Sequence, residues 1–320
     1  MLGSSHRPRA RTTLSWLLVL AGVLTACGGG ESAGGAGAGQ GVTISAAEFP
    51  WSAAALTNAI LVEVAARNPQ LGVSEIALTQ LGPAPAWAGA QRGDIDLLAE
   101  VALPNQQELA DQAAQRVTLV SETYGGADQG WYVPTASLQP GQPLEGLTSV
   151  TQLNDYAAPL GNRLVDADPS FITTQQNAQR LTGYGINLQQ VTSSEAAQLA
   201  ELRRAIERQE PILVYLYHPH WAFSEFDLTK LEEPNPYQED CFTTGDGACA
   251  MPDYAAWTAA STELQEQAPQ FFAMLERFRL PLADIETMLK QVDVDGRPVE
   301  DVAREWMEAN QPLVQEWVAQ

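Results

Sequence analysis

Basic residues are scarce in this sequence. Of its 320 residues, 17 are Lys or Arg and 39 are Asp or Glu, so the formal net charge is −22. Lysine occurs only at Lys230 and Lys290. Binding to a nucleic-acid backbone needs an excess of positive charge, so this balance excludes a nucleic-acid partner. An anionic membrane surface would also repel the folded part of the chain.

The N-terminal apolar run is too short to span a membrane. Leu14 to Leu24 has 11 residues, about half of the roughly 20 that a spanning helix needs. Three arginines precede it, and Leu24-Thr25-Ala26-Cys27 follows it. Residues 1–26 therefore resemble a bacterial lipoprotein signal peptide, which is cut before a lipid-bearing cysteine. The alternative is an ordinary secretory signal followed by a chance cysteine.

A glycine-rich segment after the cysteine supports the lipoprotein interpretation. Residues 27–41 contain a run of small residues that has nothing to pack, which is typical of a flexible tether. We expect Cys27 to be lipidated and to anchor the protein to the cell membrane. The folded part would then lie in the periplasm or at the outer face of the cytoplasmic membrane.

Cysteine is also rare. Besides Cys27, the sequence has only Cys241 and Cys249, both in one Gly- and Pro-containing loop. Two free thiols are a liability in an oxidising compartment, so we expect a structural disulfide between them. A zinc site would require further soft ligands near the loop, and the sequence provides none.

Residues for common catalytic chemistry are few. After export the only histidines are His218 and His220, and no third metal ligand has a defined spacing to them. The sequence has no Gly-x-Ser-x-Gly elbow and no glycine-rich phosphate loop. We therefore expect neither a metal ion nor a cofactor.

Hydrophobic patterning alternates between short apolar runs and stretches with helical spacing. The former are typical of buried strands and the latter of amphipathic helices. The alternation predicts an α/β fold with largely parallel sheets. Expected strands are 42–46, 73–78, 94–100, 163–165 and 212–217, and expected helices are 53–67, 84–91, 105–115, 173–182, 194–209 and 299–318, with mostly helix after Ala255.

The alternation of expected strands and helices begins again from residue 149, which indicates two α/β lobes. We expect the chain to cross twice between them, with residues 42–132 and 229–320 in one lobe and 133–228 in the other. The crossings near Trp131 and Leu228 are the predicted hinge.

Several stretches, in order along nearly the whole exported chain, resemble the solute-binding lipoproteins of ABC importers for glycine betaine, choline and related quaternary amines. They are Phe49-Pro50-Trp51, Gly93-Asp94-Ile95-Asp96 running on to Glu100, Gly130 to Pro134, Asp166 to Phe171, Tyr215 to Trp221, and the two-cysteine loop before Pro252-Asp253-Tyr254. The resemblance implies a type II bilobal binding-protein fold with ligand in the cleft. It also implies capture and delivery of a compatible solute to a permease, without chemistry on the ligand.

The chemistry of such a ligand points to particular residues. A trimethylammonium group has no N–H donor and is best held by aromatic faces. With the resemblance, this predicts a cage of Trp51, Trp131, Phe171 and Tyr217. A ligand carboxylate would bind backbone N–H groups at Ser170 and its neighbours, where a helix begins. Glu100 would face a cationic ligand that lacks a carboxylate, as choline does.

One position departs from the family pattern. Relatives usually have an aromatic residue shortly after the position of Glu100, whereas this chain has Ala102. Either another ring such as Trp87 replaces that wall, or the pocket accepts a different amine.

Two alternatives to an amine receptor stay open. One is an exported lipoprotein enzyme, and the other is a receptor for another small solute on the same bilobal scaffold. A third class, a lipid-anchored adhesion or scaffold protein, would not need a ring-lined cleft.

Overall fold

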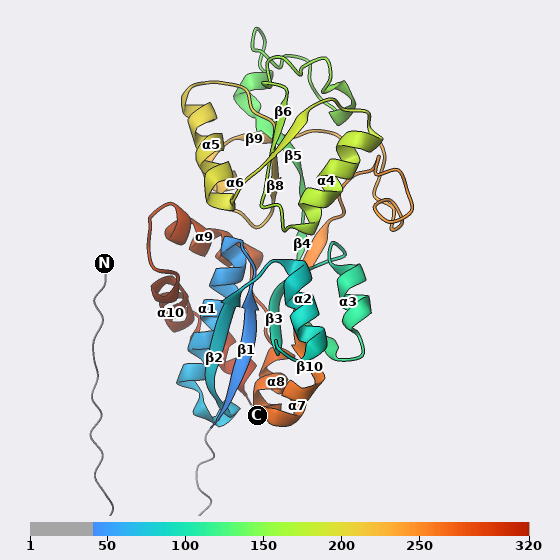
Figure 1. The fold of residues 1–320 in the computed structure, drawn as a ribbon. Coiled ribbons are helices and arrows are strands. Elements are labelled where there is room, and N and C mark those ends of the chain that lie inside the picture. Colours follow the sequence, from blue (N-terminus) through green and yellow to red (C-terminus); the bar gives the residue numbers. More distant parts are fainter. Residues whose placement is uncertain (1–40, 320) are drawn as a thin grey trace, which may run out of the picture. The chain divides into compact units, whose positions relative to one another are not determined.

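The computed structural model describes residues 41–319 (Figure 1). The predicted signal peptide (1–26), Cys27 and the tether up to residue 40 lie outside the described residues. Residues 41–319 contain two five-stranded sheets within one compact unit.

The first sheet combines strands from the two ends of the described chain. Its order is β2-β1-β3-β10-β4; β1 pairs in parallel with β2 and β3, and β10 is antiparallel to both β3 and β4. The bounds are β1 (Val42–Glu48), β2 (Val73–Gln80), β3 (Leu97–Leu103), β4 (Val117–Ala127) and β10 (Tyr254–Ser261).

The second sheet repeats this arrangement with strands from the middle of the chain. Its order is β7-β6-β8-β5-β9; β6 is parallel to β7 and β8, and β5 is antiparallel to β8 and β9. The bounds are β5 (Gln129–Pro134), β6 (Arg163–Asp166), β7 (Gln189–Thr192), β8 (Val214–Tyr217) and β9 (Leu228–Lys230). In each sheet four strands therefore run in one direction and a single strand, β10 or β5, runs in the opposite direction, which confirms the α/β class.

Helices cover both faces of the first sheet (Figure 1). Alternate residues along β1 reach two separate cores: Ile44 and Ala46 pack in one and Ala47 in the other. The helices of this lobe are α1 (Ser52–Arg67), α2 (Pro83–Arg92), α3 (Gln107–Ala113), α7 (Thr262–Gln267), α8 (Pro269–Leu275), α9 (Leu282–Asp293), α10 (Val299–Ala309) and α11 (Gln311–Val318).

The second sheet is also covered on both faces, with α4 (Ile172–Gly183) and α5 (Glu195–Glu207) on opposite sides (Figure 1). Leu181 of α4 packs in the core that contains Trp131 and Tyr215, whereas Leu199 of α5 packs with Val214 on the other face. The short α6 (Ala222–Glu225) joins β8 to β9.

The chain passes between the lobes at other places than predicted. All of β5 and β9 lie in the second sheet, so the first crossing is at Asp128, between Ala127 and Gln129, and the return lies between Lys230 and Tyr254. The predicted boundaries at 132/133 and 228/229 therefore fall inside or beside strands. We use "first lobe" for residues 42–127 and 254–319 and "second lobe" for 128–253.

Two features of the C-terminal region correct the sequence-based expectation. Residues 254–261 form β10, a buried central strand, where we expected helix; its alanines suit a position between two neighbouring strands. The predicted helix 299–318 is two helices that meet at Asn310, because Pro312 begins a new helix better than it continues an old one.

Within residues 41–319, no helix is both long enough and apolar enough to cross a membrane.

Candidate functional site

A pocket of about 450 Å³, its opening included, lies between residues of the two lobes. Strand ends and helix starts bring these residues together, since β3, β8 and β10 contribute side chains and α4 contributes its first turn. The lining residues are Trp51, Pro83, Glu100, Ala102, Asn105, Gln106, Tyr254, Gln129, Phe171, Ile172, Thr173, Tyr215 and Tyr217.

Trp51 and Phe171 form an aromatic contact between the lobes. Their ring centroids are 5.0 Å apart and the rings meet edge to face. Trp51 is the residue before α1 and has an extended backbone, while Phe171 has the same position before α4. Phe49 stacks on the other side of Trp51, with centroids 4.7 Å apart. Both predicted rings therefore reach the pocket, one from each lobe.

Two tyrosines of β8 line the second-lobe side. Tyr215 and Tyr217 are two residues apart, so they project from the same face of the sheet. The Tyr215 hydroxyl donates to Gln129 Oε1 at 2.8 Å, and the Tyr217 hydroxyl donates to Glu195 Oε2 at 2.5 Å. These bonds fix both rings, and burial raises the pKa of both hydroxyls, so they remain protonated.

Glu100 places a buried carboxylate on the first-lobe side. Only 2% of the residue is exposed, and its oxygens accept from Thr57 Oγ1 at 2.8 Å and the Tyr124 hydroxyl at 2.6 Å. Burial raises its pKa, and hydrogen bonds from Tyr124, Thr57 and Trp51 oppose that shift. Its φ of 67° is a left-handed conformation that costs a non-glycine residue free energy and is enriched at binding sites.

Trp131 does not reach the pocket, which corrects the predicted cage. Trp131 pairs with Tyr215 across β5 and β8, two residues farther along the strand than Gln129, which does line the pocket. That places it about 7 Å deeper in the sheet. Its ring is fully buried beneath the Arg180 guanidinium, 4.1 Å from the ring centroid, and its Nε1 donates to Asn177 Oδ1. Trp131 supports the second lobe from within.

Ser170 also differs from its expected role. Its N–H and hydroxyl both donate to Asp168 Oδ1, at 2.8 and 2.6 Å, so this amide is already paired. The pocket is lined instead by Ile172 and Thr173, in the first turn of α4. The first turn of a helix has N–H groups without intrahelical partners and a partial positive charge. The part of this helix start that lines the pocket therefore begins two residues after Ser170, and anion binding there stays a prediction.

The structure adds lining residues that the sequence analysis did not select. Tyr254, at the start of β10, lines the pocket and donates its hydroxyl to the His218 carbonyl. Trp87 does not supply a missing wall, because it is buried elsewhere and donates to Gln106 Oε1 at 2.8 Å. The Pro-Asp-Tyr sequence before β10 was the available signal for Tyr254.

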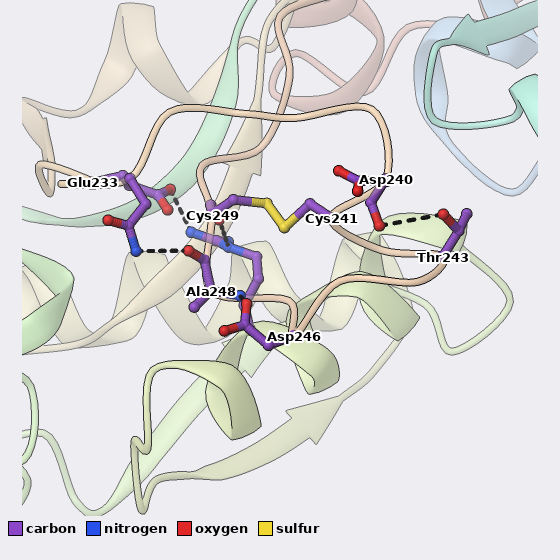
Figure 2. Close-up of a disulfide and its surroundings, with 9 residues drawn as sticks. Glu233, Asp240, Cys241, Thr243, Asp246, Ala248 and Cys249 are labelled. Carbon is purple, nitrogen blue, oxygen red and sulfur yellow. Dashed lines mark hydrogen bonds and ion pairs between the residues drawn. A yellow bond between two sulfur atoms is a disulfide. The ribbon is translucent and has the colours of Figure 1, made fainter.

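The predicted disulfide between Cys241 and Cys249 is present (Figure 2). The loop that it closes packs against α4, since Arg180 Nε donates to the Cys249 carbonyl at 3.2 Å. Arg180 also pairs with Glu233 and donates to Asn177 Oδ1. The loop, the buried arginine and Trp131 therefore form one support behind the helix that begins at the pocket.

The two described histidines have partners other than a metal. His218 Nδ1 lies 3.0 Å from Glu286 Oε1, and His220 Nδ1 accepts from the Ala222 N–H. Within residues 41–319, no group of three or more His, Cys, Asp or Glu side chains is arranged to hold a metal ion.

A curated relative shares part of this chain's sequence. The glycine betaine/carnitine transport binding protein GbuC of Listeria monocytogenes serotype 1/2a (strain 10403S) is 28% identical over 156 residues. That alignment covers 48% of this chain and 47% of GbuC, so it spans about half the length of the curated relative.

Solved structures resemble the fold over most of the chain. Lactococcal OpuAC in its closed-liganded conformation with glycine betaine has a TM-score of 0.72 and 20% identity, covering 86% of this chain and 99% of that one. An ABC-transporter choline-binding protein in complex with choline has a TM-score of 0.72 and 18% identity, covering 87% and 91%. ProX from Borrelia burgdorferi has a TM-score of 0.73 and 21% identity, covering 87% and 97%. These likenesses confirm the bilobal fold.

A family model described as the substrate binding domain of ABC-type glycine betaine transport systems (OpuAC) matches residues 42–309. The match includes both sheets and every pocket residue. The chain therefore belongs to this family of ABC-transporter substrate-binding domains.

Proposed function

We propose that this protein captures a quaternary ammonium solute in its pocket and delivers it to the permease of an ABC importer. Membership of the family makes it an extracytoplasmic solute receptor. The observation that supports an amine ligand is the lining of the pocket, which combines aromatic rings from both lobes with a buried carboxylate. No Lys, Arg or His side chain is among the lining residues within the described part of the chain.

The ring arrangement suits a cation that cannot donate hydrogen bonds. Trp51, Phe171 and Tyr217 present aromatic surface, and each ring contributes about 0.5–2 kcal/mol to binding of a desolvated cation. A zwitterion such as glycine betaine would place its carboxylate toward the first turn of α4. A cation such as choline would use Glu100. The known ligands of relatives and fold neighbours include glycine betaine, carnitine and choline.

The same lining supports binding without catalysis. Within the described residues, the pocket offers no Ser, Cys or His side chain that could form a nucleophile–base pair. We therefore propose release of an unchanged ligand.

Titration calorimetry with glycine betaine, choline, carnitine and proline tests the function. Wild type is expected to bind at least one quaternary amine, and Trp51→Leu to weaken that binding by about threefold to thirtyfold. Trp257→Leu is the matched control, because Trp257 is also partly buried in the first lobe but lies outside the pocket lining. Failure of well-folded wild type to bind any quaternary amine overturns the proposal, and tight binding of an amino acid would redirect it to another solute.

We also propose that a lipid on Cys27 holds the receptor at the membrane. The support is the sequence around Leu24-Thr25-Ala26-Cys27, which resembles a lipoprotein signal. Cys27→Ser should leave the precursor unprocessed or release the protein from the membrane fraction. Normal processing together with normal membrane retention of this variant would contradict the anchor.

A further inference from the structure

Glu195 is a buried carboxylate that contacts both lobes outside the pocket lining. It is the first residue of α5, and 7% of it is exposed. An acid at this position often caps its own helix, but Ser194 already does so by accepting from the Ala197 N–H. The carboxylate of Glu195 is therefore available for partners elsewhere.

The two oxygens of Glu195 have partners on opposite sides of the cleft. Oε2 accepts from the Tyr217 hydroxyl in the second lobe, and Oε1 accepts from the Ser52 N–H in the first lobe at 3.2 Å. Ser52 follows Trp51 and is the first residue of α1. One carboxylate thus joins a pocket ring of one lobe to the backbone beside a pocket ring of the other.

The electrostatics favour this contact when the lobes meet. The Ser52 N–H belongs to the first turn of α1, where backbone N–H groups lack intrahelical partners and attract negative charge. His220 Nε2, in the second lobe, lies 3.8 Å from the same oxygen of Glu195, Oε1. Burial raises the pKa of Glu195, but His220, Tyr217 and Ser52 outweigh burial and lower it, so the group is ionised.

We propose that Glu195 is a positioning residue that couples closure of the two lobes to the orientation of Tyr217 in the pocket. The inference rests on the proposed function. Separation of the lobes breaks the bond to Ser52 and exposes the carboxylate, whereas closure ties Ser52 to the group that holds Tyr217. Ligand bound between the rings then dissociates only after this contact opens.

Ser52→Pro removes the N–H donor from this contact and also the hydroxyl that donates to Asp293. Proline is favoured at the first position of a helix, and the extended backbone of Trp51 (φ −135°, ψ 151°) suits a residue that precedes proline. Ser52→Ala is the matched control, because it keeps the N–H and loses only the hydroxyl bond to Asp293. Glu195→Gln is a second, independent variant that keeps the side-chain shape and removes the charge.

The experiment measures affinity and dissociation rate for the quaternary amine that wild type binds best. Ser52→Pro and Glu195→Gln should each raise the dissociation rate by about tenfold, and Ser52→Ala by less than about threefold. The double variant Ser52→Pro/Glu195→Gln should be little worse than either single one, because one variant removes the donor of this contact and the other removes the charge of its acceptor. Additive effects would indicate two unrelated structural defects and overturn the inference.

The outcome separates the inference from the function. If wild type binds a quaternary amine and both variants release it at the wild-type rate, only the inference fails. If wild type binds none, the proposed function fails and the inference fails with it.

Discussion

In the second lobe, the fully buried Arg180 pairs with Glu233, donates to Asn177 and the Cys249 carbonyl, and covers the ring of Trp131. In the first lobe, the buried carboxylate of Glu100 accepts hydrogen bonds from the hydroxyls of Thr57 and Tyr124 and has no ion-pair partner among the described residues. One lobe buries a charge with its counter-charge, and the other buries a charge beside the pocket.

We interpret this difference as a division of roles between the two buried charges. An ion buried without a counter-ion is unfavourable, so the burial that raises the pKa of Glu100 also creates a preference for an incoming cation. The pair of Arg180 and Glu233 is satisfied within the protein and holds α4 and the disulfide loop together. We therefore propose that the first lobe supplies charge recognition and that the second supplies firmly supported rings.

The largest expected effect comes from breaking the paired charge. Arg180→Met leaves Glu233 buried without its partner and should lower the free energy of unfolding by about 3–5 kcal/mol. Urea denaturation measures this loss. The control Arg163→Met removes an exposed pair with Glu201 in the same lobe and should cost about 1 kcal/mol or less. Equal losses would mean that the buried pair is no different from a surface pair.

Glu100→Gln tests the unpaired charge and should change ligand preference. Removal of the carboxylate charge should weaken choline binding by about tenfold to a hundredfold, and glycine betaine binding by much less, because that ligand has its own carboxylate. Calorimetry on both ligands measures the ratio. Glu122→Gln, an exposed acid of β4 outside the pocket lining, is the control. An unchanged ratio would show that Glu100 does not recognise ligand charge.

A smaller effect should appear with pH at Asp293, where the lobes meet. Burial, then the charge of Glu195, raises the pKa of Asp293 to about 6, while Ser52, His220 and Trp221 oppose the shift. A raised carboxyl pKa means that the packed arrangement favours the protonated acid. Protonation of Asp293 therefore stabilises this arrangement as the pH falls through about 6, and the stabilisation is lost as the pH rises. Because Glu195 belongs to the other lobe, closure of the lobes should become more favourable as the pH falls, and affinity for the ligand should rise with it.

For wild type we therefore expect affinity for glycine betaine to rise by about threefold between pH 7 and pH 5, after allowance for solvent screening of this partly exposed group. Asp293→Asn should flatten that rise. Titrations of both proteins at several pH values measure it, and an identical slope in the two would exclude Asp293 as the source.

The smallest effect is expected for Trp131→Phe. The variant keeps an aromatic face beneath Arg180 and loses only the indole N–H bond to Asn177. Affinity for the ligand should stay within about twofold of wild type, because the ring does not line the pocket. A tenfold loss of affinity with unchanged stability would return Trp131 to the cage.

The sequence was sufficient for the features that depend on local pattern. The alternation of strands and helices, the disulfide, and pocket positions for Trp51, Glu100, Phe171 and Tyr217 were all predicted and are present. The family resemblance of the motifs and, for Tyr217, the end of an apolar strand predicted that these side chains lie at the ends of strands and the starts of helices. Pockets of α/β folds occur at such positions.

The features that were missed depend on distances along or between strands. Trp131 and Gln129 share a face of β5, and only the depth of each residue beneath α4 decides which reaches the pocket. Strand β10 is alanine-rich, so its own pattern resembles a helix, and its pairing with β3 and β4 determines its structure. Tyr254 enters the pocket only because that strand exists.

The bond between Ser52 and Glu195 has a consequence for how this protein can vary through evolution. Its donor is a main-chain N–H, which every residue except proline provides. Position 52 can therefore drift among many side chains without loss of the contact, while position 195 must keep an acceptor of the right length. In a set of homologues, we expect a constrained acid opposite a variable position, a pattern that paired substitutions would not reveal.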